Sequence, residues 1–423
     1  MKENKRAVWS WAFYDWGNSA YSTTVMAGFF PLFFKEYWAD PHNPNQSTFY
    51  LGMANSIASI VVASLAPLLG SIADQGSAKK KFLIFFSFMG VIMTGGLRMV
   101  SQGNWQMAVL FYVIATIGFA SGNVFYDSLL PGLASEERVD IVSSLGCGLG
   151  YLGGGLLFLV NVFMYLKPEI FGISDGATAI KLSFLSVAVW WAVFTIPLIL
   201  FVTEPKNYDK VDMKNAIQMG WIQLIQTFDE IRNMKVVGTF LLAYFFYIDG
   251  VDTIIKMAVD YGMSLNFSGE SLIIALLIVQ FVAFPAALIY GQLASKVGIK
   301  TAIMIGIIAY SFITFLGYFI TKAWHFYVLA ILIGLFQGGI QALSRSLYTR
   351  IIPAEKSAEF FGFYNMLGKF AAIIGPALMG TISLVTGSAR LGILSILLLF
   401  ILGAFFLNKV DLDEGKRLAA DGL

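Results

Sequence analysis

The segment Tyr244–Lys256 reads YFFYIDGVDTIIK and lies inside an apolar run, residues 236–261, that is long enough to cross a bilayer. Four polar residues interrupt this run: Asp249, Asp252, Thr253 and Lys256. Their spacing of three or four residues places them on one face of a helix. Charged groups at membrane depth are costly and normally face a protein interior or a water-filled cavity. We therefore expect this face to belong to a binding or coupling site.

The composition is that of a membrane protein. Hydrophobic residues make up 57% of the 423 residues and charged ones only 13%, against about 25% charged in soluble domains. A chain of this length holds roughly twelve spans with short connections. The net charge of +2 offers no basic surface for nucleic acid. The single cysteine, Cys147, excludes an internal disulfide.

The apolar segments predict an all-α membrane protein with twelve transmembrane helices. They lie near residues 10–34, 49–72, 82–101, 105–127, 139–164, 180–202, 236–261, 270–291, 300–321, 325–348, 360–385 and 390–408. Of the 28 lysines and arginines, 19 fall before the first span, after the last and in or next to alternate connections, 5 fall in or next to the other connections, and 4 lie well inside spans. This bias predicts that both termini are cytoplasmic.

The two halves of the chain repeat each other. Gly70 in GSIADQGSAKKK corresponds to Gly291 in GQLASKVGIK, and Gly153 corresponds to Gly375 at nearly the same offset. We therefore expect two pseudo-symmetric six-helix bundles, residues 1–202 and 236–423, joined by a cytoplasmic linker over 203–235. Internal repeats of this kind, with a binding site between the halves, are typical of secondary transporters.

Several motifs resemble a known family. Gly70, Ala73, Asp74 and the basic cluster Lys79–Lys81 resemble the loop signature of the major facilitator superfamily, and the likeness extends over nearly the whole chain. Within it, YDWGNSAY (14–21), FFYIDGVDT (245–253) and EFFGFYNMLGKFAAIIGP (359–376) resemble the vacuole-effluxer branch. The resemblance implies a transporter rather than an enzyme, moving an amino-acid-like solute by alternating access.

The acids of the seventh span are the first site candidates. Asp252 and Lys256 are four residues apart and suit a helical ion pair, which leaves Asp249 without an internal partner. Burial favours the neutral form of a carboxylate, so such a group can exchange a proton and couple proton flow to solute movement. The two histidines, His42 and His325, lie in outward-side segments. The alternative is a self-neutralised pair beside a structural Asp249.

The first span carries a similar pattern. Asp15, Asn18 and Ser19 match Asp249, Asp252 and Thr253 in type and spacing. Asp15 lies nine residues after Arg6, about 13 Å along a helix. It therefore suits either a cytoplasmic-side gate or a cavity, and Asn18 is a cavity candidate.

Further cavity candidates come from the eighth, tenth and eleventh spans. Gln337, Gln341 and Arg345 share one face of the tenth span, where amides can also serve as packing contacts between helices. Arg345 and Lys369 are fixed cations that suit a carboxylate on Asp15, on Asp127 or on the solute, or a structural ion pair. The remaining candidates are Gln280 and Asn365.

A separate group of charges lies at the cytoplasmic ends of the spans. We expect Asp74 and Asp127, with basic partners such as Lys79 and Arg138, to form latches between helices that break when the transporter opens. Such latches shift the balance between inward-open and outward-open states without touching the solute.

The sequence therefore predicts a secondary transporter for a small polar or zwitterionic solute, coupled to protons. We expect a monomer in a bilayer, in a bacterial inner membrane, with no cofactor, metal or nucleic-acid partner. One alternative is a proton-driven exporter of amphipathic compounds or lipids, favoured by the 38 phenylalanines. Another is a non-transporting receptor or scaffold, disfavoured because the loops are short and the charges lie inside the membrane.

Overall fold

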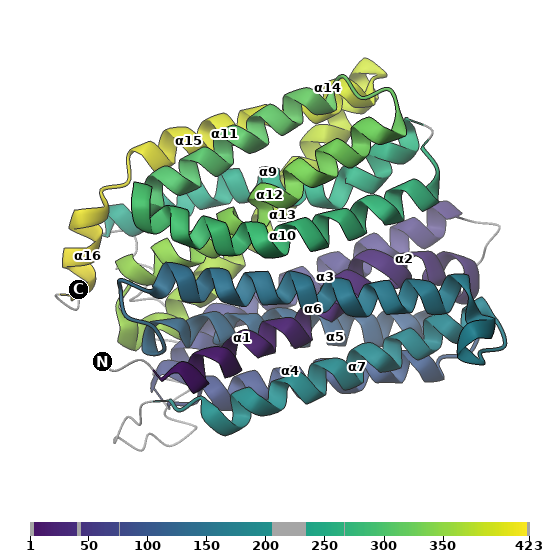
Figure 1. Ribbon diagram of the computed structural model, residues 1–423, viewed down its shortest axis with the longest axis horizontal. Helices are drawn as coiled ribbons and strands as arrows, with labels where there is room; N and C mark the ends of the chain where they lie inside the picture. The colour runs from purple at the N-terminus through teal and green to yellow at the C-terminus, as the bar shows by residue number, and fades with distance from the viewer. Residues whose placement is uncertain (1–3, 40–43, 76, 205–233, 266, 421–423) are drawn as a thin grey trace.

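The computed structural model describes residues 4–39, 44–75, 77–204, 234–265 and 267–420, and long helices running along one axis dominate it (Figure 1). The helices, with 3₁₀ and π segments labelled η, are α1 (Lys5–Ala20), η1 (Tyr21–Phe29), α2 (Phe30–Phe33), η2 (Phe34–Trp38), α3 (Pro44–Gln75), α4 (Lys79–Gly96), η3 (Leu97–Met99), α5 (Trp105–Ser128), η4 (Leu130–Gly132), α6 (Val139–Leu166), η5 (Pro168–Phe171), α7 (Gly176–Phe201), α9 (Lys235–Ser264), α10 (Gly269–Val297), α11 (Ile299–Gly317), α12 (Ala323–Ile351), η6 (Ala354–Lys356), α13 (Ser357–Thr386), α14 (Ala389–Ser395), α15 (Leu397–Asn408) and α16 (Leu412–Ala420).

The predicted all-α membrane fold is confirmed. Among the described residues, 11 helical segments are long and apolar enough to cross a membrane. The first span comes in addition, because it is a helical run over residues 5–38 that two π segments divide. The last span is also divided, since α14 ends at Ser395 and α15 begins at Leu397.

The helices form two bundles that follow the order of the chain. In the first, α1 packs on α6 and α7, and α4 packs on α5; in the second, α10 packs on α12, and α9 on α13 and α15. Helices of the second half lie above those of the first half in Figure 1. The bundles meet mainly through α3 with α13 and α6 with α10. The predicted linker lies mostly in 205–233, outside the described residues.

Two glycines allow the bundles to approach closely. A Cβ atom on Gly70 of α3 would overlap the Ala358 carbonyl at the start of α13. A Cβ on Gly291 of α10 would lie 2.6 Å from Ser144 Oγ near the start of α6. These two glycines are the pair that the sequence repeat equates, and each allows a close contact with the opposite half of the chain.

The start of α1 and the helix α16 lie at the same end of the bundle (Figure 1). We call this end the terminal end. The connections α3–α4, α5–α6 and α12–α13 are also there, since an even number of spans separates each from the start of the chain. That the terminal end is cytoplasmic remains a prediction from the lysine and arginine distribution.

Candidate functional site

Asp249 is fully buried in α9, against α13. Its Oδ1 atom accepts hydrogen bonds from the Gly375 backbone N–H at 2.9 Å and from Thr253 Oγ1 at 3.3 Å. Its Oδ2 atom is buried and has no hydrogen-bond partner within the described part of the chain. The expectation that Asp249 lacks any internal partner is therefore wrong for one oxygen and holds for the other.

A glycine on α13 makes this contact possible. A Cβ atom at Gly375 would overlap the Thr253 hydroxyl and lie 2.7 Å from Asp249 Oδ1. The next residue, Pro376, has no backbone N–H, so it removes one helical hydrogen bond at this point. Asp249 therefore binds α13 beside the position where Pro376 interrupts the helical hydrogen bonds.

The other charges of α9 lie nearby and are more open. Asp252 and Lys256 face each other at 4.0 Å, with side chains 30% and 53% exposed. This is the predicted pair, but the distance between its charges is long and both side chains are partly exposed. Lys369 of α13 is half-buried, and its neighbouring charges are Lys256 and Asp252.

In the first bundle, Asp15 has a different environment. It accepts a hydrogen bond from Ser19 Oγ at 3.0 Å, and Tyr126 Oη lies 3.5 Å from its second oxygen. Asn18 is buried and donates to Asn123 Oδ1 at 2.6 Å. Asn18 therefore joins α1 to α5 instead of facing a cavity as predicted.

Amide side chains connect the bundles near the middle of the helices. Gln280 Nε2 of α10 donates to Thr23 Oγ1 of the first span at 3.3 Å. Gln341 of α12 accepts from Tyr151 Oη of α6 at 2.8 Å. Gln337 is buried, and its Oε1 atom has no partner among the described residues. The three predicted glutamines thus all lie between the halves, and Tyr151 and Thr23 are partners that the sequence did not indicate.

Arg345 of α12 is engaged by side chains of the first bundle, so in this conformation its guanidinium already has partners. Its guanidinium donates to Asp127 Oδ1 at 2.9 Å and to Ser143 Oγ at 2.9 Å, and it lies over the Trp11 ring at 5.0 Å. Of the three partners that the sequence left open, the structure selects Asp127. Arg345 is accordingly a latch residue, and Asp127 pairs with it instead of with Arg138.

Two other predicted residues, Arg138 and Asn365, lie at the start of α6 and on α13. Arg138 is exposed at the start of α6. Asn365 of α13 donates to the Phe361 carbonyl of its own helix at 2.9 Å.

The predicted latch at Asp74 also spans the two halves. Asp74 forms an ion pair with Lys79 at 2.8 Å and accepts the backbone N–H groups of Ala358 and Glu359 at the start of α13. Lys79 Nζ donates to Ser357 Oγ at 2.7 Å. A carboxylate at a helix N-terminus is favourable because the free N–H groups and the helix dipole attract negative charge.

The sequence did not indicate a third set of latches. Asp140 pairs with Arg350 at 2.8 Å and also binds the Ser346 hydroxyl. Glu136 pairs with Lys416 of α16 at 2.5 Å and with Arg350 at 3.6 Å. The hydrogen bond from Lys416 is the main reason that the pKa of Glu136 is lowered. Together the latches hold the bundles together at the terminal end.

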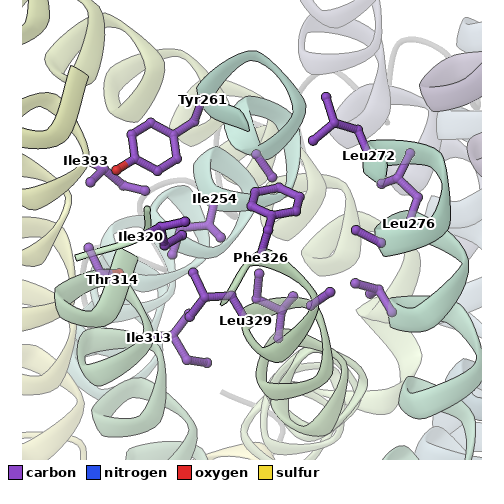
Figure 2. Close-up of a pocket in the computed structure, with 15 residues that line it drawn as sticks. Ile254, Tyr261, Leu272, Leu276, Ile313, Thr314, Ile320, Phe326, Leu329 and Ile393 are labelled. Carbon is purple, nitrogen blue, oxygen red and sulfur yellow. The ribbon is translucent and has the colours of Figure 1, made fainter. Parts of the chain in front are cut away.

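An apolar pocket lies inside the second bundle (Figure 2). Ile254, Leu272, Phe326 and Leu329 are among its lining residues, and its volume is about 50 Å³. Its two hydroxyls, on Tyr261 and Thr314, already donate to backbone carbonyls. Drug-sized ligand pockets measure about 300–1,000 Å³, so this pocket is small, and its lining contains none of the charged candidates.

Comparison with known proteins gives a consistent result. Residues 3–420 match the family model described as vacuole effluxer Atg22 like. The chain is 41% identical to an uncharacterized MFS-type transporter, YxiO, of Bacillus subtilis, over 97% of this chain and 96% of that one. It is 27% identical to autophagy-related protein 22 of Saccharomyces cerevisiae, over 86% of this chain and 77% of that one.

Solved structures share the fold at low sequence identity. The major facilitator proton:xylose symporter XylE superposes with a TM-score of 0.74 at 15% identity, over 98% of this chain and 97% of that one. The human organic anion transporter MFSD10 superposes with a TM-score of 0.73 at 12% identity, over 95% and 99%. At these identities the likeness concerns the fold alone.

Proposed function

Since the chain belongs to the Atg22-like vacuole-effluxer family of major facilitator transporters, we propose that it moves a small polar or zwitterionic, amino-acid-like solute by proton-coupled alternating access. The solute would bind between the two bundles, near the amides that join α1, α6, α10 and α12. The family is that of transporters, and the autophagy-related relatives belong to an effluxer family. Solute class and proton coupling are the proposed steps.

The buried carboxylate of Asp249 is the observation that carries the proposal. One oxygen is fixed by Gly375 and Thr253, and the other has no hydrogen-bond partner among the described residues. An uncompensated carboxylate at membrane depth is costly when charged, so this group is suited to take up a proton. The adjacent pair of Asp252 and Lys256 is partly exposed, and we propose that protons reach Asp249 from this side.

The latches support the alternating-access part of the proposal. Asp74, Asp127 and Asp140 all bind the second bundle near the terminal end. We infer that this end is the cytoplasmic side of a bacterial inner membrane, from the bias of lysine and arginine. In the described conformation the terminal end is then closed, and opening it requires breaking these contacts.

Uptake into liposomes tests the proposal. Purified protein would be reconstituted, and labelled amino acids would be offered with and without an imposed pH gradient. We expect gradient-driven uptake by the wild type and its loss in Asp249→Asn, with the melting temperature preserved. Gradient-driven uptake that survives Asp249→Asn would refute the coupling role. The absence of flux for every amino acid would refute the solute class.

A further inference from the structure

Lys369 is a cation near the middle of the membrane-spanning helix α13, and no counter-ion pairs with it among the residues that the structure describes. Within the described residues it makes no hydrogen bond and no ion pair, although its side chain is half-buried. The cations at the latches differ in this respect. Lys79, Arg345 and Arg350 each pair with a carboxylate at 2.8 or 2.9 Å.

Lys369 lies on the face of α13 that is turned toward the first bundle. Gly362 is two helical turns earlier on the same face, and a Cβ there would lie 2.6 Å from Pro67 Cα of α3. The charges closest to Lys369 are Asp252 and Lys256 of α9. The ammonium group therefore stands between the bundles, close to the seventh-span charges, and does not face the lipid.

The charge balance of this region favours one added negative charge. Asp252 and Lys256 cancel each other, so Lys369 leaves a net charge of +1. Asp249 of α9 contacts α13 at Gly375, six residues after Lys369, and it adds a negative charge only when it is deprotonated. An uncompensated cation inside a membrane protein is costly and calls for a partner. Arg345 is bound to Asp127 and Lys256 faces Asp252, so of these three cations Lys369 is the one without a carboxylate partner among the described residues.

We propose that Lys369 binds the carboxylate of the transported solute and makes the transporter selective for solutes that carry one. The inference rests on the proposed transport function and names the group that the site recognises. A single ammonium acts as a point charge, which matches one carboxylate better than a phosphate dianion. Because Asp249 adds a negative charge when it is deprotonated, the carboxylate and the proton on Asp249 would bind together.

The test compares three chemical forms of the same compounds. The melting temperature of the purified full chain would be measured with the twenty amino acids, with their amides, which lack the carboxylate, and with their N-acetyl forms, which lack the ammonium. We expect the first and third sets to stabilise the wild type, and the amides to need about ten times the concentration. Lys369→Met should abolish this preference, and Lys369→Arg should retain part of it.

A matched lysine provides the control. Lys181 also lies within a span, but its ammonium donates to Tyr37 Oη at 2.8 Å in the first bundle, so Lys181→Met should keep the wild-type preference. Equal stabilisation by amides and acids, a preference that survives Lys369→Met, or stronger stabilisation by inorganic phosphate would overturn the proposal. Gradient-driven uptake that depends on Asp249 but treats amides and acids alike would leave the transport function standing and remove only the role of Lys369.

Discussion

Asp15 and Asp249 occupy equivalent places in the two bundles, yet their surroundings differ. Each lies on the first helix of its half, hydrogen-bonds a hydroxyl four residues later and packs on a glycine of a facing helix, Gly150 or Gly375. Asp15 is also close to Tyr126 and to the charge of Arg345. Asp249 accepts a backbone N–H of α13, and its second oxygen has no hydrogen-bond partner in the described part of the chain.

The difference leads us to propose separate roles for the two acids, one in closure and one in proton exchange. Asp15, the acid of the first bundle, lies close to the charge of Arg345, which belongs to a latch. This position suits a residue that senses or stabilises closure of the terminal end. Asp249, the acid of the second bundle, accepts a hydrogen bond from the backbone of α13. The same helix carries Lys369, and its first residues bind Asp74. We therefore assign proton exchange to Asp249 and a closing role to Asp15.

The sharpest test of this comparison exchanges each acid for its amide. We expect Asp249→Asn to reduce gradient-driven uptake by about tenfold or more, because it removes the group that exchanges the proton. Asp15→Asn should keep the response to the gradient and change mainly the maximal rate. Both variants would be assayed in the same liposomes. Equal loss in both would show that the two carboxylates share the coupling role.

The latch between Arg345 and Asp127 gives the next largest effect. Breaking a buried ion pair by removing one partner costs about 3–5 kcal/mol, so Arg345→Gln should strongly favour an open terminal end. Cys147, the single cysteine, lies 3.4 Å from Arg345 Nη2 and can report the opening. We expect its labelling by a maleimide to rise in Arg345→Gln.

A second variant separates gate opening from unfolding. The double variant Arg345→Gln with Asp127→Asn removes both charges, so it should bring Cys147 labelling back toward that of the wild type. Labelling that stays high in the double variant, with a lowered melting temperature, would point to a general loss of structure instead.

Glycine-to-alanine changes probe the contact at Asp249 more finely. Gly375→Ala should lower the free energy of unfolding by about 1–3 kcal/mol, since the new methyl group overlaps Thr253 and crowds Asp249. Gly150→Ala should cost less, because its Cβ would lie 2.6 Å from the Ser19 hydroxyl and 2.9 Å from Asp15 Oδ1, which is less severe than the overlap at Gly375. Unfolding by heat or denaturant measures both.

Another glycine of the same helix is the matched control. Gly380 of α13 has nothing within 4 Å of an added Cβ. Gly380→Ala should therefore be neutral or stabilising by up to about 1 kcal/mol, from helix propensity alone. If Gly375→Ala were as well tolerated as Gly380→Ala, the close packing of Asp249 against α13 would be wrong.

The sequence predicted the fold well because the bilayer constrains it strongly. Span length and hydropathy located the helices, and the repeat located Gly70 and Gly291, whose lack of a side chain is what allows the bundles to touch. Each of these signals can be read along a single chain, without knowing which helices pack on one another.

Contacts between helices were predicted less well, for a physical reason. Spacing says which residues share a face of one helix, but it does not say which helix lies opposite. Arg345 was therefore left with three possible carboxylates, although only Asp127 is paired with it. Asn18 matched Asp252 in spacing, yet its amide binds Asn123 within the same bundle. The contact between Glu136 and Lys416 joins segments 280 residues apart, and no periodicity indicates it.

Glu136 offers the smallest effect and a contrast to the buried acids. Its ion pair with Lys416 lowers its pKa below the usual value of a glutamate, so the stabilisation is present above that usual value and is lost as the pH falls through the lowered one. The contact is therefore intact across neutral pH. Because the side chain is 57% exposed, solvent screening limits the contribution to about 0.5 kcal/mol.

We expect the contact between Glu136 and Lys416 to be insensitive to pH between 7.5 and 6. Glu136→Gln should raise maleimide labelling of Cys147 slightly, by the same factor at pH 7.5 and at pH 6, because Glu136 stays ionised over this range. Arg417 on the same helix α16 provides the control: Arg417→Gln keeps Lys416 and should leave the labelling unchanged. A labelling increase in Glu136→Gln that vanished between pH 7.5 and pH 6 would mean that Glu136 takes up a proton there, and the terminal end would then share the proton sensing that we assign to Asp249 alone.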